Sequence, residues 1–219
     1  MSIVFVVAMA KGSVAQATDT LAAVDERDLD PDPLRQFERW FAEAGAAGDA
    51  VPEAMALATA TAEGRPSARM VLLKRADESG FAFHTNYESR KGVELAENPY
   101  AALLFHWRPL GRQVRVEGRV ERVTAQESEA YFRTRPHASR IAAWASPQSR
   151  PLSGRDELER RYADAVARHG DDPQLPPHWG GFRLVPDAYE FWEHGEDRLH
   201  DRVRYERDGD AWSQTRLAP

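Results

Sequence analysis

The chain has 219 residues, of which 42% are hydrophobic, enough to build a core for one large domain or two small ones. Its formal net charge of −6 argues against a nucleic-acid or anionic-membrane partner, because such surfaces attract a net basic face. The lack of cysteine excludes disulfides, thiolate metal sites and cysteine nucleophiles, and it suits a cytoplasmic location. No H-E-x-x-H or similar spacing occurs, so we expect no bound metal.

The first 31 residues lack sustained periodicity and end in an acidic, proline-broken stretch, so residues 1–31 are interpreted as a mobile arm. The apolar run within them, 3–10, is far shorter than the ~20 residues that span a bilayer. Residues 32–219 contain no internal repeat or linker. They predict a single folded domain.

The first predicted element is a helix at about 33–46. Asp32 is a typical N-cap, Pro33 suits the first helical position, and aromatic residues follow at helical spacing. Short β-type runs separated by turn signals come next, at 54–61, 68–75, 81–85, 100–107 and 113–123. They predict a meandering antiparallel sheet, which a helix at about 88–97 interrupts.

Thr124 and Glu127 form a capping box that begins a helix reaching about residue 133. Pro136 separates it from a second helical run toward Trp144, and a third helix is predicted at 154–168. Strands are predicted at 180–185, 188–193, 202–207 and 211–217. The fold class is therefore α+β, mainly β, with one β-barrel-like domain and helices packed outside it.

Two cations five residues apart lie in the run R-M-V-L-L-K, from Arg69 to Lys74. In an extended strand such side chains point to opposite faces, so we expect them to serve different groups. A pair of ordinary strand-end cations is the alternative.

The run T-N-Y-E-S-R-K, from Thr85 to Lys91, lies at a predicted junction between a strand and a helix. Free N–H groups and the helix dipole favour phosphate there. Arg90 offers a fork of donors and Lys91 a point charge, and both are unfavourable at a helix N-terminus without an anion. We interpret the run as a phosphate site, with a capped helix and solvated cations as the alternative.

Tyr131 and Arg135 are four residues apart and share a helix face, and Ser139 lies just beyond Pro136. This set could hold a second phosphate; the alternative makes Tyr131 a core residue and Arg135 a helix-end cation. Neutral hydrogen-bonding groups suited to the edge of a heterocycle come from Gln113, Gln148 and Ser149.

The pentamer R-L-H-D-R follows Glu190-Phe191-Trp192 after a short interval. If it is extended, Arg198, His200 and Arg202 line one face and would suit an anionic ligand. An exposed strand on which Asp201 pairs a neighbouring arginine explains the pentamer equally well.

In their order along the chain these segments resemble the pyridoxine/pyridoxamine 5'-phosphate oxidase family, from about residue 32 to residue 219. The resemblance rests on nine motifs: R-M-V-L-L-K, T-N-Y-E-S-R-K, R-Q-V-R-V-E-G, Y-F-R-T-R-P-H-A-S, Q-S-R-P, W-G-G-F, E-F-W, R-L-H-D-R and the terminal R-L-A-P. It implies a homodimer of split β-barrels with FMN at the subunit interface.

The resemblance also implies roles for individual residues. Contact with FMN is implied for Arg69, Met70, Val71, Leu72, Leu73, Lys74, His84, Thr85, Arg90, Lys91, Gln113, Gln148, Ser149, Trp192 and Arg202. The substrate phosphate would be held by Lys74, Tyr131, Arg135 and Ser139, and the substrate ring by Arg198, Leu199 and His200. Arg198 and His200 would be the catalytic residues. The implied reaction oxidises pyridoxamine or pyridoxine 5'-phosphate with O2 and yields hydrogen peroxide.

Three departures from the family pattern stand out. His84 stands where the family often has tyrosine, and Glu193-His194 replace the usual glutamine and glycine. We expect the second change to place a carboxylate and an imidazole beside the flavin. The arm lacks the basic R-R-E-Y-like segment that often closes over substrate. The competing functions are a phenazine-biosynthesis flavin oxidase on the same fold and a non-catalytic flavin-binding protein.

Overall fold

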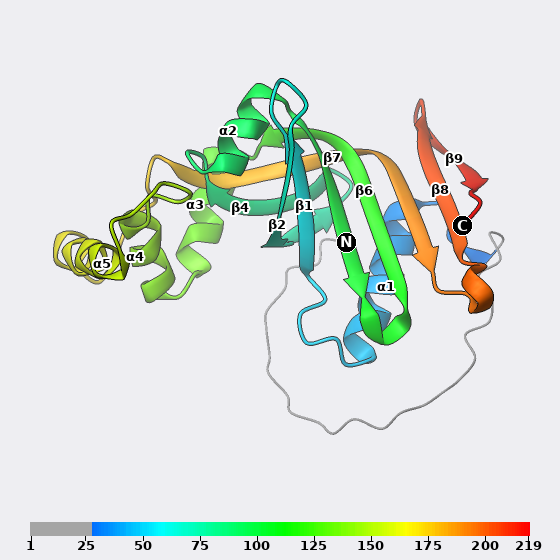
Figure 1. The fold of residues 1–219 in the computed structure, drawn as a ribbon, viewed down its shortest axis with the longest axis horizontal. Helices are drawn as coiled ribbons and strands as arrows, with labels where there is room; N and C mark the ends of the chain where they lie inside the picture. Colours follow the sequence, from blue (N-terminus) through cyan, green and yellow to red (C-terminus); the bar gives the residue numbers. More distant parts are fainter. Residues whose placement is uncertain (1–27) are drawn as a thin grey trace.

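The computed structural model describes residues 28–219, which form a nine-stranded antiparallel sheet and five α-helices (Figure 1). The helices are α1 (Pro33–Ala46), α2 (Arg90–Glu97), α3 (Ala125–Thr134), α4 (His137–Ala145) and α5 (Arg155–His169). The strands are β1 (Ala54–Ala60), β2 (Pro66–Leu72), β3 (Arg75–Asp77), β4 (Gly80–Asn86), β5 (Tyr100–Trp107), β6 (Arg112–Arg122), β7 (Trp179–Glu193), β8 (Asp201–Asp208) and β9 (Ala211–Arg216). The predicted fold class, α+β and mainly β, is confirmed.

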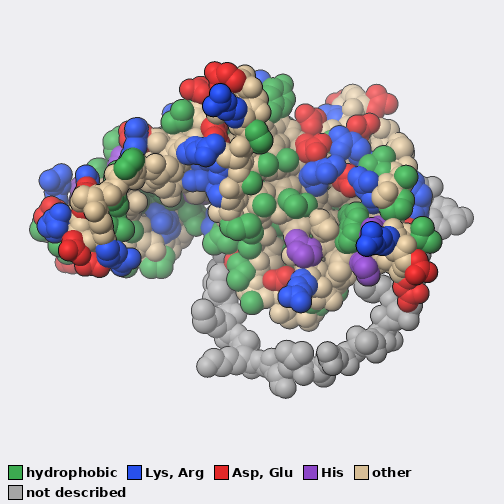
Figure 2. Space-filling view, viewed as in Figure 1, with side chains coloured by type: hydrophobic (Ala, Val, Ile, Leu, Met, Phe, Trp, Pro, Cys, Tyr) green, Lys and Arg blue, Asp and Glu red, His purple; other side chains and the backbone are tan. Residues whose placement is uncertain are grey.

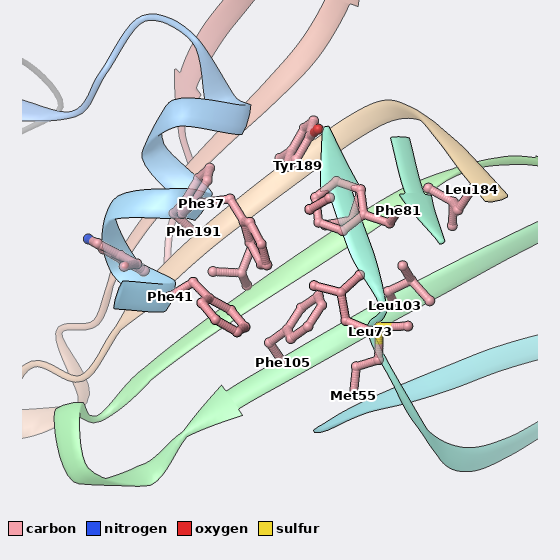
Figure 3. Close-up of a cluster of buried hydrophobic side chains, with 14 of the residues drawn as sticks. Phe37, Phe41, Met55, Leu73, Phe81, Leu103, Phe105, Leu184, Tyr189 and Phe191 are labelled. Carbon is pink, nitrogen blue, oxygen red and sulfur yellow. The ribbon is translucent and has the colours of Figure 1, made fainter. Parts of the chain in front are cut away.

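Helix α1 fills the inner face of the sheet with aromatic side chains. The Asp32 carboxylate accepts the Leu34 N–H at 2.9 Å and so caps the helix, as predicted. Phe37, which is 1% exposed, packs edge-on against Phe81 and Phe105, each with a centroid separation of 4.9 Å (Figure 3). The core of the domain lies between this helix and the sheet.

The sheet curls until its two ends meet at Leu73 and Lys74. Its strand order is β2-β1-β5-β6-β7-β4-β3, and the end strands β2 and β3 are consecutive in the chain. The Leu73 N–H donates to Glu53 O at 2.9 Å, whereas the Lys74 N–H donates to Ala82 O at 2.8 Å. The prediction of one strand at 68–75 is therefore wrong, because the chain changes pairing partner between these two residues.

Strand β7 is continuous where two strands were predicted. Its first half pairs with β4 and its second half with β8, while β6 runs along its other side. Pro186 lies where β4 ends and β8 has not yet begun, so its missing N–H removes no ladder bond on that side. On the other side of β7, the pairing with β6 shifts register at the same place, between Glu117 and Gly118. The prediction failed because a proline inside a strand normally signals its end.

Four residues assigned to the arm, 28–31, belong to the packed domain. Leu29 is 6% exposed in the main core, and Asp30 O accepts a hydrogen bond from the Tyr205 hydroxyl at 2.9 Å. The domain therefore begins at least three residues before the predicted boundary at residue 32. The rest of the arm, 1–27, lies outside the described residues.

The outer face of β1, β2 and β5 carries exposed apolar side chains. Met70, Ala56 and Leu104 form one row across the three strands, and Met70 is 64% and Leu104 37% exposed. Figure 2 shows hydrophobic side chains spread over the middle of this face. Helices α3–α5 extend from one end of the sheet and leave this row uncovered (Figure 1). None of the helices in the described part of the chain is long and apolar enough to cross a membrane.

Candidate active site

A first group of predicted residues gathers where α2 begins. Ser89 is the N-cap, and the next two cations point in different directions. Lys91 is buried, and its Nζ donates to Thr85 Oγ1 at 3.1 Å and to Gln148 Oε1 at 2.9 Å. Burial, with the nearby positive charge of Arg69, lowers the Lys91 pKa to about 8. The guanidinium of Arg90 is exposed instead.

The Lys91 contacts fix the orientation of the Gln148 amide. Its Oε1 accepts from both Lys91 and Thr85, the latter at 3.0 Å, so its NH2 group is the part left to donate to a ligand. The next residue, Ser149, has a φ of 69°, a left-handed conformation that costs a non-glycine residue free energy. Strained backbone of this kind is concentrated at functional sites.

Arg69 belongs to the same group but points inward. It donates to Leu57 O at 3.1 Å, to Ser67 Oγ at 2.5 Å and to Glu94 Oε2 at 3.2 Å. Glu94 was not among the predicted site residues. Its spacing of four from Arg90 predicts the ion pair between those two residues, but nothing in the sequence signals its contact with Arg69.

A second group surrounds Tyr131. The His84 ring stacks on Tyr131 at 4.1 Å and lies 5.5 Å from Trp179. Lys74 Nζ is 6.0 Å from the Tyr131 centroid, and the Arg135 guanidinium is 4.6 Å from that of Trp179. The structure therefore brings Lys74, His84, Tyr131 and Arg135 together, and it adds Trp179, which sequence reasoning missed.

The cations of this second group suit an anion. Burial lowers the pKa of both Lys74 and Arg135, and the charge of Arg135 lowers that of Lys74 further. Arg135 Nη1 is buried without a hydrogen-bond partner among residues 28–219. A phosphate between the two cations would offset both costs. Ser139, the remaining residue of the predicted set, is half-buried in the first turn of α4.

His84 is neutral at pH 7 within this group. Burial, assisted by the charges of Lys74 and Arg135, lowers its pKa to about 4. A Cβ at Gly181 would come within 2.9 Å of His84 Nε2, so the ring needs a glycine opposite it. Gly181 therefore relieves crowding between β4 and β7 at this point.

A third group lies at the other end of β7. Gln113, Trp192 and Arg202 are aligned across β6, β7 and β8. Arg202 Nε donates to Glu190 Oε1 at 2.9 Å, and its Nη1 to Ala218 O at 2.8 Å. These contacts tie the C-terminal residues to the sheet beside Trp192.

Of the two predicted catalytic residues, His200 approaches this third group, whereas Arg198 is exposed on the turn before it. The segment was expected to be extended, but Glu196–Arg198 forms a 3-10 turn, and Arg198 has a left-handed φ of 65°. The His200 ring lies 4.6 Å from Trp192, and its Nδ1 accepts the Gly195 N–H at 3.2 Å. A neutral His200 therefore carries its proton on Nε2. The prediction failed because the close approach of Gly195 to the Leu199 carbonyl folds the chain back.

The third group lies far from the other two within one chain. His84 pairs with Gly181 on β7, and Trp192 is eleven residues further along the same strand. At about 3.3 Å per residue this is roughly 36 Å of strand. One small molecule cannot touch both ends of β7 in a single chain, but two chains could contribute one end each.

Comparison with known proteins identifies the fold and the family. Residues 46–168 match the family model described as pyridoxamine 5'-phosphate oxidase, and residues 179–219 match that of the pyridoxine 5'-phosphate oxidase C-terminal dimerisation region. The chain belongs to the pyridoxamine 5'-phosphate oxidase family. The predicted resemblance is confirmed.

The relatives within this family are close. The chain is 57% identical over 203 residues to the pyridoxine/pyridoxamine 5'-phosphate oxidase of Cupriavidus taiwanensis, covering 92% of this chain and 96% of that one. It is 57% identical over 201 residues to the protein of that name from Burkholderia vietnamiensis, with 90% and 94% covered.

Solved structures share the fold. PhzG from Burkholderia lata, in complex with tetrahydrophenazine-1-carboxylic acid, has a TM-score of 0.85 at 37% identity over 91% of this chain and 99% of that one. An FMN-binding protein from Nostoc punctiforme, with a TM-score of 0.69 at 19% identity over 87% of this chain and 100% of that one, supports the fold alone.

Glu193, one of the residues that depart from the family pattern, lies away from these three groups. Glu193 was expected beside the flavin, but it is buried on the side of β7 opposite Trp192 and forms an ion pair with Arg112. Arg112 also contacts Glu43 and lies 4.5 Å from the Trp40 ring. The expectation is therefore wrong, because alternation along the strand turns Glu193 toward α1.

His194, the second residue that departs from the family pattern at this point, lies near the third group. His194 is exposed, and its ring centroid lies 5.3 Å from that of His200. No three His, Asp or Glu side chains gather in a metal-binding arrangement between residues 28 and 219.

Proposed function

We propose that this chain is an FMN-dependent oxidase that converts pyridoxamine 5'-phosphate and pyridoxine 5'-phosphate to pyridoxal 5'-phosphate, with O2 as acceptor and hydrogen peroxide as by-product. The observation that carries the proposal is the presence of two separate cationic groups: Arg90 and Lys91 where α2 begins, and Lys74 and Arg135 around Tyr131. One group suits the phosphate of a cofactor and the other that of a substrate. The names of the close relatives support the same reaction.

The residues of the chain position the reactants. Arg90 would bind the FMN phosphate, and the oriented Gln148 amide would donate to an acceptor on the flavin ring. Lys74 and Arg135 would hold the substrate phosphate, and the His200 Nε2–H would donate to the substrate. When bound, FMN supplies the redox chemistry, accepting a hydride from the substrate carbon and passing electrons to O2.

The complete site requires two chains. The two cationic groups lie at one end of β7, and Trp192, Arg202 and His200 lie at the other. The exposed row of Met70 and Leu104 supplies an apolar face for a second copy, and the match of residues 179–219 to a dimerisation region supports a homodimer. Each dimer would contain two sites, each built from opposite ends of two chains.

A subunit-mixing experiment tests this arrangement. Arg135→Met removes a residue from one end and His200→Gln a residue from the other, so each variant alone should turn over slowly. A mixed dimer has one site in which both residues are intact, and random mixing should restore about a quarter of the wild-type activity. Turnover is followed by pyridoxal 5'-phosphate absorbance and peroxide release. No recovery in a mixture that contains mixed dimers would contradict the proposal.

The fold match to PhzG favours a second candidate, a phenazine-type flavin oxidase. The Lys74–Arg135 group favours the first, because a phenazine precursor has no phosphate to bind. The two are separated anaerobically by adding pyridoxamine 5'-phosphate or tetrahydrophenazine-1-carboxylic acid to the yellow holoprotein. Bleaching of the flavin by the first compound supports the leading proposal. Bleaching by the second alone identifies a phenazine-type enzyme, and bleaching by neither identifies a non-catalytic flavin-binding protein.

A further inference from the structure

We propose that Glu94 is the positioning residue of the cofactor-phosphate site, and that it sets the preference of this chain for a phosphorylated flavin over an unphosphorylated one. The inference rests on the proposed function, since it assumes that FMN is the ligand. Glu94 lies in the second turn of α2, is 3% exposed, and pairs with both Arg69 and Arg90.

The Glu94 carboxylate collects four hydrogen bonds from three elements. Oε2 accepts from Thr59 Oγ1 at 2.5 Å, Ser67 Oγ at 2.6 Å and Arg69 Nη2 at 3.2 Å. Oε1 accepts from Arg90 Nε at 2.8 Å. Burial alone would raise the Glu94 pKa, but these hydrogen bonds outweigh burial and lower it to about 2. The carboxylate is therefore charged at neutral pH.

The hydrogen bond to Glu94 orients Arg90, whose side chain is 61% exposed. A guanidinium is planar, so fixing its Nε–H direction also fixes the plane in which its terminal nitrogens lie. Those nitrogens are then held in one orientation beside the start of α2, where a phosphate would accept a bidentate pair. Without Glu94, the exposed arginine would lose rotamer freedom on binding phosphate.

The charge balance of the cluster points the same way. One carboxylate lies between two guanidinium groups, Arg69 and Arg90, and Lys91 adds a third cation nearby. The group keeps a net positive charge that suits a phosphate dianion. Because Glu94 is buried, it neutralises part of the mutual repulsion of the arginines without being exposed to a ligand at the surface.

A purely structural role is the alternative, since the same contacts join α2 to β1 and β2. That role would weaken binding of any flavin equally. A positioning role would act on the phosphate alone, so riboflavin, which lacks the phosphate, discriminates between the two.

The experiment compares Glu94→Ala and Glu94→Gln with the wild-type apoprotein in titrations with FMN and riboflavin. We expect FMN affinity to fall about tenfold in Glu94→Ala, in line with loss of an oriented charge-assisted contact, and riboflavin affinity to change less than about twofold. The FMN affinity of Glu94→Gln should lie between those of the wild type and Glu94→Ala. The two arginines bond to different oxygens of Glu94, and glutamine retains only one of these oxygens. If Glu94→Ala does not fold, Glu94→Gln carries the comparison.

Two further measurements sharpen the result. The 31P resonance of FMN bound at saturation should shift toward that of free FMN in the variants. Arg90→Ala should lower FMN affinity by itself but add little to Glu94→Ala, because the two residues act together. Glu193→Gln is the matched control: it alters an equally buried carboxylate paired with an arginine and should keep the wild-type affinity ratio.

The outcomes are distinct. An unchanged ratio of FMN to riboflavin affinity in the Glu94 variants, or full additivity with Arg90→Ala, overturns the positioning role. Failure of the wild-type protein to bind FMN overturns the proposed function itself.

Discussion

Lys91 carries its charge in a setting that disfavours it. The residue is 9% exposed, and burial lowers its pKa from the ordinary value of 10.5 to about 8. The folded state therefore releases this proton before the unfolded state does. Between pH 8 and pH 10.5 the unfolded state holds more protons, so folding stability gains from this residue as the pH rises.

Lys91→Met isolates that contribution. The free energy of unfolding of the wild-type apoprotein, minus that of the variant, should increase by roughly 1 kcal/mol per pH unit across this window. Urea unfolding at several pH values from 7.5 to 10 measures it. A constant difference across the range would show that burial does not perturb the Lys91 proton.

The Arg112–Glu193 pair is a structural contact by our assignment. Arg112→Leu would leave Glu193 buried and unpaired, so we expect a loss of about 3 kcal/mol in the free energy of unfolding. Glu193→Gln keeps a neutral hydrogen-bonding group and should cost much less. Urea unfolding and steady-state kinetics on both variants check this. A changed flavin spectrum or turnover in Glu193→Gln would place Glu193 in the site after all.

At the residue scale, the sequence predicted which side chains gather but not all of their neighbours. Tyr131 and Arg135 lie close together as their helical spacing predicted, and Lys74 joins them as the family resemblance implied. The contact of Glu94 with Arg69 and that of Trp179 with His84 could not be predicted, because both depend on strands that pair across long stretches of chain. The sequence also left open which way Lys91 points.

At the scale of elements, helices were predicted better than strands. The caps at Asp32 and Thr124 are as expected, because capping depends on residues within one turn. The errors are the change of partner at Leu73–Lys74, the unbroken β7 and the turn at Glu196–Arg198. Each depends on which distant strand lies alongside, and local propensity carries no such information.

The turn before β8 offers a direct test of how an element places the proposed catalytic side chain of His200. A Cβ on Gly195 would overlap the Leu199 carbonyl, so Gly195→Ala should open the turn and displace His200. We expect turnover to fall at least about tenfold, while FMN content and melting temperature stay close to wild type. Steady-state kinetics, the flavin spectrum and a thermal melt measure these effects.

Gly45→Ala is the matched control for that change. Nothing lies within 4 Å of a Cβ at Gly45, which is helical, so alanine should be neutral or stabilising by up to about 1 kcal/mol. Equal loss of turnover in both variants would mean that the close approach at Gly195 has no bearing on His200.

At the scale of the whole molecule, the proposed dimer makes cofactor binding depend on association. Leu104→Asp places a carboxylate on the exposed apolar row and should yield monomers, since an unpaired charge is costly to bury in an interface. FMN affinity should fall with it, because the two ends of β7 would no longer meet. Sedimentation velocity and flavin content measure both effects.

Val166→Asp on α5 is the control, at 41% exposure against 37% for Leu104. It should leave both mass and flavin content unchanged. Retention of FMN by a monomeric Leu104→Asp variant would contradict the two-chain site.

The double pairing of β7 also governs how the polypeptide folds as it is made. Until residues 179–193 leave the ribosome, β2-β1-β5-β6 and β3-β4 have no strand to join them, and the edges of β4 and β6 are unpaired. The two family models divide the chain between 168 and 179, just before this strand. That boundary separates the segments matched by the two models, but it does not separate two folding units. Synthesis of the last fifth of the chain completes the barrel that the earlier part begins.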